Sequence, residues 1–436
     1  MTIAQAPRAA TPTPPQAPSR DTGIDLVRAL CVLGVVLLHA IMVGVTVTEA
    51  GPVFENASDG SWWITPLSWV LQVMPLFFVI GGFSGYLAYR RLRERGGSAS
   101  DFVAGRLHRL LRPAIFTVVV VGLALAALTV IGIPAELIAT AGFRYGQPLW
   151  FLGVFALCQA LLPALAAAHR RAPCATIGAL AAASVLVDVL RAATGIEALG
   201  FLNLAFVWMT LQQLGFFLAD GRIDALSRRT RLLAVSGALV ILAITFLTGV
   251  HSPDLIANIN PPTAALLLVG VVHTGTFSLH RDRIERLSRR ALPATFTGFV
   301  TRRAMTIYLW HMPILLAMAG LTAVLALLTG AALPALGSGE WWAGRPLWLG
   351  TAVALTAVVA MAFTRFETQP APESTRSVGG LALSVFLGLI GIVMLLVLGT
   401  SVATAMIAVA LLAASLRLAR RTSVEPARLR ASFAIA

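Results

Sequence analysis

Charged residues are scarce in this chain, and lysine is absent. Only 12% of the 436 residues are charged, all 33 basic residues are arginines, and the formal net charge is +14. A GC-rich genome accounts for the exclusive use of arginine. Because the arginines are scattered over short loops and form no single basic face, nucleic-acid binding is a weak interpretation of this charge.

Cysteine is also scarce, with only Cys31, Cys158 and Cys174 in the sequence. All three fall inside or at the edge of apolar segments, so we expect them to be packing residues. Their spacing provides neither a disulfide framework nor a set of metal ligands. We therefore expect no metal site and no permanently bound cofactor.

Apolar residues, in contrast, are abundant and occur in long runs. The chain is 58% hydrophobic, and its mean hydropathy is +0.84. Helices and closed barrels are the structures that span a bilayer, and these runs are too long and too uniformly apolar for barrel strands. We therefore predict an all-α, polytopic membrane protein with about twelve transmembrane helices. The predicted spans are residues 24–47, 65–89, 113–133, 149–168, 174–191, 200–219, 231–250, 263–280, 304–330, 347–364, 381–398 and 402–418.

The distribution of arginine predicts how the chain is oriented. With the N-terminus inside, every arginine except Arg144, Arg191 and Arg345 falls in an inner loop, in a tail or at the adjoining end of a span. Inner loops of membrane proteins carry such an excess of positive charge. We therefore predict a multi-pass protein of the inner (cytoplasmic) membrane with both termini in the cytoplasm.

The composition divides the chain into five parts. Residues 1–23 are rich in Ala, Pro and Thr and contain no apolar h-region, so we expect a disordered cytoplasmic tail and not a cleaved signal peptide. Residues 24–368 hold the first ten spans, and residues 369–380 are a predicted cytoplasmic linker. Residues 381–418 form two additional predicted spans, to which we assign no role. Residues 419–436 are a predicted basic cytoplasmic tail.

Two polar residues in the first span are the leading functional candidates. Arg28 and His39 are eleven positions apart, which places them within roughly 20° of one helix face and about 16 Å apart along it. Ionisable residues inside a membrane are costly and commonly functional. Arg28 could instead be an interfacial anchor, and His39 could make a hydrogen bond between helices. Asp25 lies within reach of Arg28 and could hold its guanidinium in place.

Other candidates lie near three later spans. Arg106 and Arg109 precede the span 113–133. They either belong to the general excess of positive charge in the inner loops or bind a phosphorylated ligand. Trp150 starts a span at the outer interface, where tryptophan is a common anchor. Tyr308 and His311 lie in the inner third of the span 304–330, where an isolated histidine is more often structural than catalytic.

Together these segments resemble the membrane-bound acyltransferase 3 family, the multi-span O-acyltransferases of bacterial envelopes and secondary metabolites. The resemblance covers about residues 22–368, and it rests on five motifs in the family's order. Asp25, Arg28 and His39 match the family's D-x-x-R helix with R-x10-H spacing, and MPLFFVIGGF matches its second motif, with Gly81 in place of Ser. Arg106, Arg109 and Pro113 match an R-x-x-R followed by Pro, and Leu149 to Leu152 match L-W-F-L. Tyr308, Leu309, His311 and Pro313 match Y-L-x-H-x-P.

This resemblance implies transfer of an acyl group, usually acetyl, from a cytoplasmic acyl-CoA to a hydroxyl. The implied acceptor is a glycan, a glycolipid or a glycosylated small molecule. Family members with a fused esterase-like domain pass the acyl group to it, whereas the short outer loops of this chain imply acceptance within the helical bundle.

The resemblance also assigns expected roles to the candidate residues. His39 is expected to act as a general base or as a transient acyl carrier, with Arg28 as its catalytic partner. Arg106 and Arg109 are expected to hold the CoA phosphates. The residues expected to contact substrates are Asp25, Trp150, Tyr308 and His311.

Two other classes of function are compatible with the composition. A secondary transporter or flippase fits twelve spans, but such proteins commonly show internal repeats and several charges near the midplane. Here no repeat is evident, the first span dominates, and Asp188 and His273 are minor candidates. A non-catalytic membrane scaffold would require neither Arg28 nor His39.

Overall fold

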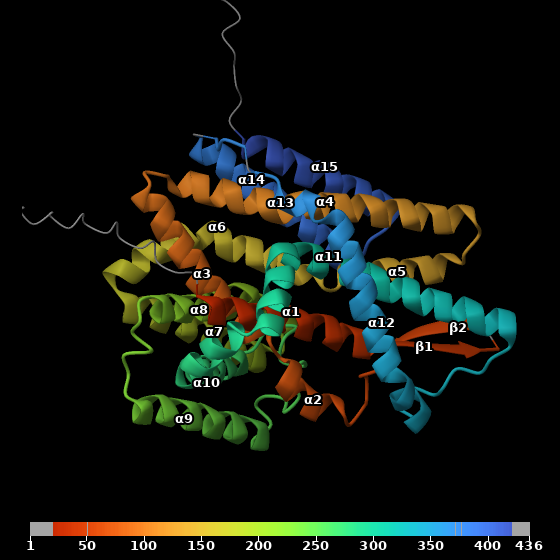
Figure 1. The fold of residues 1–436 in the computed structure, drawn as a ribbon, viewed down its shortest axis with the longest axis horizontal. Helices are drawn as coiled ribbons and strands as arrows, with labels where there is room; N and C mark the ends of the chain where they lie inside the picture. Colours follow the sequence, from red (N-terminus) through yellow and green to blue (C-terminus); the bar gives the residue numbers. More distant parts are fainter. Residues whose placement is uncertain (1–20, 50, 371, 376, 421–436) are drawn as a thin grey trace, which may run out of the picture.

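The computed structural model describes residues 21–49, 51–370, 372–375 and 377–420. It confirms a polytopic helical architecture, in which the described chain forms an elongated bundle with one short hairpin (Figure 1). The predicted tail 1–23 and the predicted basic tail 419–436 lie mostly outside the described residues.

The helices follow the predicted spans closely. Their bounds are α1 (Thr22–Met42), α2 (Ile64–Leu71), α3 (Met74–Glu94), α4 (Ala99–Val130), α5 (Ala135–Gly146), α6 (Leu149–Arg171), α7 (Pro173–Thr194), the 3-10 helix η1 (Glu197–Leu202), α8 (Asn203–Ala219), α9 (Arg228–Leu247), α10 (Ala265–Ser288), α11 (Ala291–Thr329), α12 (Gly339–Phe363), α13 (Arg365–Thr368), α14 (Val378–Val397) and α15 (Val402–Leu418).

Ten of the twelve predicted spans coincide with helical segments long and apolar enough to cross a membrane. The other two coincide with α10 and α15. Helix α15 is apolar but has only 17 residues. Helix α10 has 24 residues, but its second half carries several arginines and acidic residues, which lower its hydropathy.

The first predicted span is too long at its C-terminal end. Helix α1 ends at Met42, and Val43–Thr48 forms strand β1, which pairs antiparallel with β2 (Gly51–Asn56). The sequence VGVTVT is rich in β-branched residues, which favour extended backbone over helix. The predicted span 24–47 would place His39 in the interior of the helix, whereas it lies in the last turn of α1.

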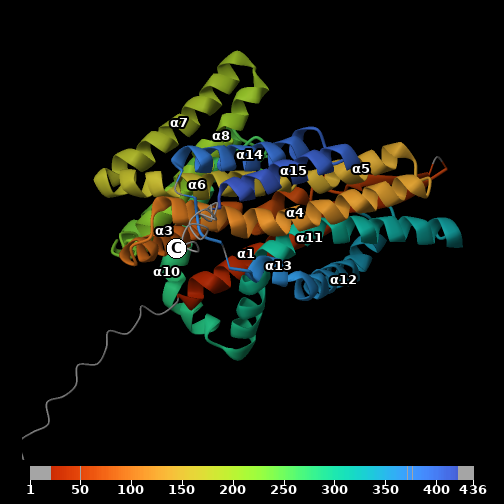
Figure 2. The same ribbon diagram turned by 90° about the horizontal axis from the view of Figure 1, so that it is seen from above.

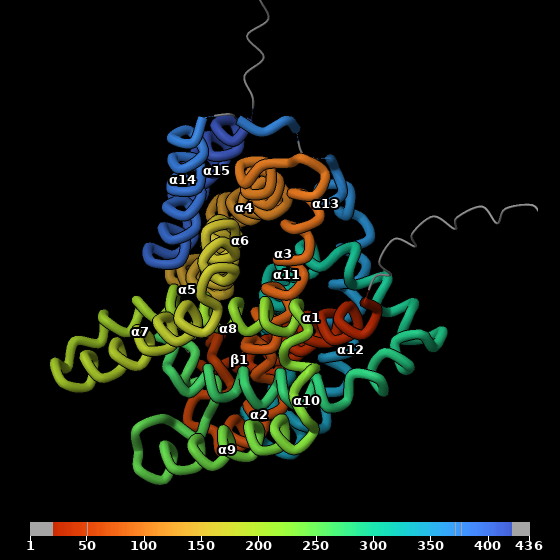
Figure 3. The backbone as a smooth tube through the Cα atoms, turned by 90° about the vertical axis from the view of Figure 1, so that its left-hand side faces the viewer, coloured from red at the N-terminus to blue at the C-terminus, as the bar shows by residue number. Residues whose placement is uncertain are grey.

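Helix α1 lies inside the bundle, where it contacts α3, α10, α11 and α12 (Figures 1 and 3). Helices α7 and α9 lie at the periphery (Figure 3), and most of their side chains are exposed. On the other side of the bundle, α14 and α15 pack against α4 and α6. The two additional C-terminal helices are therefore packed onto the helices of the preceding ten-span segment.

Two buried serines join α14 to α15. The Ser384 hydroxyl donates to the Ser415 carbonyl oxygen at 2.7 Å, and the Ser415 hydroxyl donates to the Ser384 carbonyl oxygen at 2.6 Å. Hydrogen bonds of this kind hold helices together where no water competes for the polar groups.

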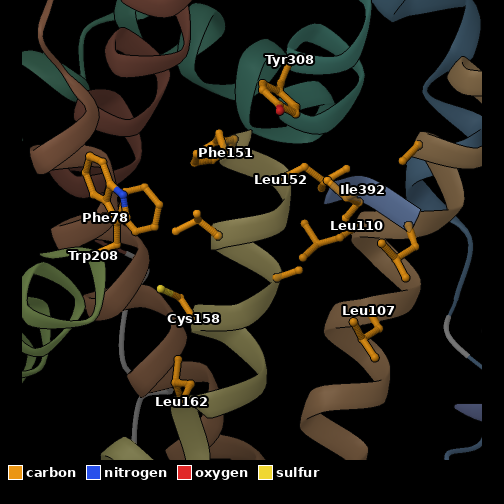
Figure 4. Close-up of a cluster of buried hydrophobic side chains, with 14 of the residues drawn as sticks. Phe78, Leu107, Leu110, Phe151, Leu152, Cys158, Leu162, Trp208, Tyr308 and Ile392 are labelled. Atoms are coloured by element: carbon orange, nitrogen blue, oxygen red, sulfur yellow. The ribbon is translucent and has the colours of Figure 1, made fainter. Parts of the chain in front are cut away.

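An aromatic cluster fills the space between α3, α6, α8 and α11. Phe78 stacks on Trp208 with ring centroids 4.4 Å apart, and Tyr308 makes an edge contact with Phe151 at 5.0 Å (Figure 4). Offset and edge-to-face ring contacts of this kind add to the stability gained from burial alone. The cluster fixes the position of α11 relative to α6.

Close packing of α3 on α8 depends on two glycines. A Cβ atom at Gly82 would lie 2.2 Å from the Gln212 carbonyl oxygen, and one at Gly215 would lie 2.1 Å from the Val79 carbonyl oxygen. Both neighbours are backbone atoms, which cannot rotate away. Gly82 of the MPLFFVIGGF motif and Gly215 of α8 therefore permit the close approach of the two helices.

We predict that Gly82→Ala destabilises the protein by about 1–3 kcal/mol, because α3 and α8 must separate to admit the methyl group. The measurement is the apparent melting temperature in detergent. Gly178→Ala in α7 is the matched control, since no atom lies within 4 Å of its added Cβ. The control should be neutral or slightly stabilising, and equal melting temperatures for the two variants would contradict this account.

Candidate active site

His39 occupies the last turn of α1 with its imidazole in a defined orientation. Its Nδ1 lies 2.9 Å from the Val35 carbonyl oxygen, which can only accept a hydrogen bond. Nδ1 therefore carries the hydrogen of the neutral ring, and Nε2 carries the free lone pair. The side chain is partly buried, so this nitrogen is available as a base or a nucleophile inside the bundle.

The structure places His311 directly beside His39. The two ring centroids are 5.0 Å apart, although the residues are separated by most of the chain. His311 is fully buried, its Nδ1 lies 2.5 Å from the Tyr308 carbonyl oxygen, and its Nε2 has no hydrogen-bond partner among the described residues. Both neutral rings therefore keep an Nε2 lone pair, and the two rings lie in contact.

Tyr308 anchors this region of α11 to the start of α6. Its hydroxyl donates to the Pro148 carbonyl oxygen at 2.7 Å, and its ring lies 6.1 Å from that of His311. Trp150, in the first turn of α6, lies against Trp208 with ring centroids 5.5 Å apart. Tyr308 is thus part of the paired-histidine region, whereas Trp150 belongs to the aromatic cluster around Trp208.

At the other end of α1, Arg28 is held by two polar groups. Its guanidinium contacts the Asp25 carboxylate at 3.2 Å and donates to the hydroxyl of Ser84 in α3. A cavity of about 520 Å³ opens here between α1 and α3. Its polar lining consists of Asp21, Asp25, Arg28, Ser84, Arg90, Arg91 and Glu94. Arg90 and Arg91 in this lining were not singled out from the sequence, although they follow the MPLFFVIGGF motif on the same helix.

Arg106 and Arg109 are not among the residues that line this cavity. The Arg106 guanidinium stacks over the Phe102 ring at 4.9 Å, and it is close enough to Arg28 and Arg109 to be repelled by both. Arg109 itself is exposed. The end of the bundle that holds Arg28, Arg90, Arg91, Arg106 and Arg109 is called the arginine-rich end below.

The two ends of the candidate site are joined by one continuous helix. Because α1 is unbroken from Thr22 to Met42, Arg28 and His39 are about 16 Å apart along it. On the face between them, Cys31 is buried and Val35 is partly buried against the main core.

Cys158 is buried, like Cys31, whereas Cys174 is exposed in the first turn of the peripheral helix α7. The prediction that all three cysteines are packing residues was therefore wrong for Cys174. Within the described part of the chain, no group of three His, Cys, Asp or Glu side chains is placed to bind a metal ion.

Sequence analysis missed Glu367, which controls the shape of α11. This helix bends sharply before its second half (Figures 1 and 2). Near the bend, the buried Glu367 carboxylate of α13 accepts hydrogen bonds from the Met305 amide at 3.2 Å, the Thr306 amide at 3.1 Å and the Thr306 hydroxyl at 2.9 Å. A carboxylate at the start of a helical segment satisfies amides that lack a helical partner.

Burial raises the pKa of Glu367, while these hydrogen bonds and the charge of Arg109 oppose the rise. The only signal in the sequence was an acidic residue directly after the tenth span, two positions beyond Arg365. Glu367 thus holds α13 against the turn of α11 that precedes Tyr308 and His311.

The fold and the site define a multi-pass helical membrane protein with two histidines paired inside the bundle and several arginines at one end of it. Residues 21–365 match the model of the acyltransferase 3 family, described as an acyltransferase domain. The chain therefore belongs to this family and is a membrane acyltransferase. Comparison with curated proteins gave no match, and comparison with solved structures gave none either.

We predict that Glu367→Ala lowers the apparent melting temperature in detergent more than Glu367→Gln. The alanine leaves two amides and a hydroxyl without an acceptor, at about 1–3 kcal/mol for each buried group, whereas glutamine keeps one acceptor oxygen. Glu136→Ala, an exposed position in α5, is the control and should be nearly neutral. Equal melting temperatures for all three variants would show that the Glu367 carboxylate does not stabilise this part of α11.

Proposed function

We propose that the protein transfers an acyl group, acetyl in the first instance, from acyl-CoA to a hydroxyl of a glycan, a glycolipid or a glycosylated metabolite. The observation that carries this proposal is the pairing of His39 with His311 inside a domain of the acyltransferase 3 family. Two imidazoles with free Nε2 lone pairs provide a base for the acceptor hydroxyl.

The arginine-rich end is the proposed entrance for acyl-CoA. Guanidinium groups bind phosphate oxygens through paired hydrogen bonds, and Arg28, Arg106 and Arg109 provide three such groups close together. Asp25 orients the Arg28 guanidinium. The pantetheine arm separates the phosphates of CoA from its thioester, so it can extend along α1 toward His39. This proposal places the arginine-rich end at the cytoplasmic face of the inner membrane, with both termini on that side.

In the direct mechanism, His39 acts as a general base. Its Nε2 accepts the proton of the acceptor hydroxyl while the hydroxyl oxygen attacks the thioester carbonyl carbon. The new C–O bond forms, the C–S bond breaks, and the CoA thiolate receives the proton from His39. His311 stabilises the transiently protonated ring, because its buried Nε2 can accept a hydrogen bond from it.

A two-step mechanism uses the same pair of histidines. The His39 Nε2 attacks the thioester carbonyl carbon, the C–S bond breaks, CoA leaves as the thiolate, and an acyl-imidazolium forms. The acceptor hydroxyl oxygen then attacks this acyl carbon while the His311 Nε2 accepts the hydroxyl proton. The bond from the acyl group to His39 breaks, neutral His39 is regenerated, and the proton on His311 passes to the CoA thiolate. The presence of a second free imidazole nitrogen supports this route as well as the direct one.

The proposed acceptor reaches the histidines from the end of the bundle opposite Arg28. There α1 ends at Met42, three residues after His39. The next residue, Val43, starts the β1–β2 hairpin and pairs with Asn56. The narrow, largely apolar interior limits water near the thioester, and thereby limits hydrolysis.

We predict that purified wild-type protein releases CoA from acetyl-CoA, and that an envelope glycan or lipid extract stimulates the release. His39→Ala should lower the rate by at least about a hundredfold, and His311→Asn should lower it by a smaller factor. Free thiol is followed over time, and the melting temperature of each variant confirms that it is folded.

The two routes are separated by incubating the protein with labelled acetyl-CoA without acceptor and then quenching the reaction. Label on His39 indicates the two-step mechanism. Full activity in His39→Ala would exclude both routes. Movement of substrate across vesicles without CoA release would indicate the transporter alternative.

We further predict that Arg28→Met raises the KM for acetyl-CoA by about tenfold or more, because a charged hydrogen bond contributes about 1.5–3 kcal/mol. Arg95→Met is the matched control, since it removes an exposed charge at the same end without touching the cavity. An equal change of KM in both variants would show a general charge effect and no phosphate site at Arg28.

A further inference from the structure

Arg345 is the arginine that fits the charge pattern least well. It is one of three arginines that the orientation rule leaves on the outer side, and it lies in the first half of α12. It is only 8% exposed. A buried cation far from the arginine-rich end requires partners that compensate for the loss of water.

The partners of Arg345 are two indole rings and the end of α1. Its Cζ lies 3.7 Å from the centre of the Trp341 ring and 5.2 Å from that of Trp348. Its Nη1 donates to the Ala40 carbonyl oxygen at 3.4 Å and to the Val43 carbonyl oxygen at 3.3 Å. Stacking on aromatic faces leaves the guanidinium hydrogens free to donate sideways.

Trp348 reinforces the same contact. Its indole Nε1 donates to the Ala40 carbonyl oxygen at 2.9 Å. The last carbonyl groups of a helix have no partner within the helix, and cations are favourable at this negative end. Arg345 and Trp348 therefore provide from α12 the C-terminal cap that α1 does not provide for itself.

His39 lies in the turn that this cap holds. Its own carbonyl oxygen accepts from the Val43 amide, and Ala40 is the next residue along the chain. Helix α12 also packs on the α11 turn after His311, where Ala352 contacts the cluster of Ala40, Met312 and Leu315. One helix thus braces both segments that carry the paired histidines.

We propose that Arg345 and Trp348 are positioning residues that hold the last turn of α1, so that the His39 imidazole meets His311 and the reacting acyl group. This inference rests on the proposed function of His39. An error of about 1 Å in the position of a catalytic group can lower a rate by about a hundredfold. The proposed acyl-CoA entrance at Arg28 is about 16 Å from the cap, so loss of the cap should leave acyl-CoA binding intact. We therefore expect the cap to affect the chemical step at His39.

The test compares kcat and KM for acetyl-CoA in Arg345→Met, Arg345→Lys and Trp348→Phe. We expect kcat to fall about tenfold to a hundredfold in Arg345→Met with KM unchanged. Arg345→Lys should recover part of kcat, because it restores a cation at the helix end. Trp348→Phe should show a smaller loss, since it keeps the ring and removes only one donor.

Matched controls are Arg144→Met, which removes another arginine from the same side, and Trp62→Phe, which alters an 82% exposed tryptophan. Both should leave kcat unchanged. The double variant Arg345→Met/His39→Ala should be no slower than His39→Ala alone, because the cap acts through His39.

A second measurement does not depend on catalysis. Diethyl pyrocarbonate modifies free imidazole nitrogens, and mass spectrometry gives the rate at His39 in each variant. We expect Arg345→Met to change this rate severalfold relative to Arg144→Met. If no variant or wild type released CoA but this change occurred, the proposed function would fail while the positioning role stood.

An unchanged labelling rate together with unchanged kcat would overturn the positioning role. The positioning role would also be overturned if Arg345→Met lowered kcat and the melting temperature and changed KM together, and Arg345→Lys recovered none of them. That result would show that Arg345 only supports the fold.

Discussion

The structure depends on how a single helix, α1, is held at both ends within an apolar bundle. At its start, Asp21 caps the Ile24 amide at 2.9 Å and also contacts Arg281 of α10 at 2.5 Å. At its end, Arg345 and Trp348 cap the carbonyl groups of the last turn. Polar groups without water must find partners in the protein, so each end of α1 is fixed by a different helix. This arrangement keeps Arg28 and His39 at a constant separation.

The bend of α11 is the second requirement for the site. A straight helix of 39 residues would be about 58 Å long, whereas α11 bends before its second half (Figure 2). The Glu367 carboxylate accepts hydrogen bonds from the backbone amides of Met305 and Thr306. In the following turn, the Tyr308 hydroxyl donates a hydrogen bond to the Pro148 carbonyl oxygen. His311 lies one turn further on, beside His39. The contact between the two histidines is therefore set by side chains that take no part in it.

Most of the helices could be predicted from the sequence, because length and hydropathy alone decide which segments can cross a membrane. The hairpin after α1 was missed, since the apolar run continues past Met42 and hydropathy does not distinguish a strand from a helix. The motifs of the acyltransferase 3 family led to Asp25, Arg28, His39 and His311 one by one. They did not indicate that His311 contacts His39, that Trp150 packs on Trp208, or that Arg345 and Glu367 support the region.

The sequence by itself determined the class of the protein, the approximate spans and the residues that are costly to place among apolar neighbours. These are properties of local composition and of spacing along one helix. Only the tertiary structure decided which of these residues meet. The separation between His39 and His311 depends on where α11 bends and on how α12 packs, and both follow from contacts between residues far apart in the chain. Periodicity carries no information about such contacts, because it describes one helix at a time.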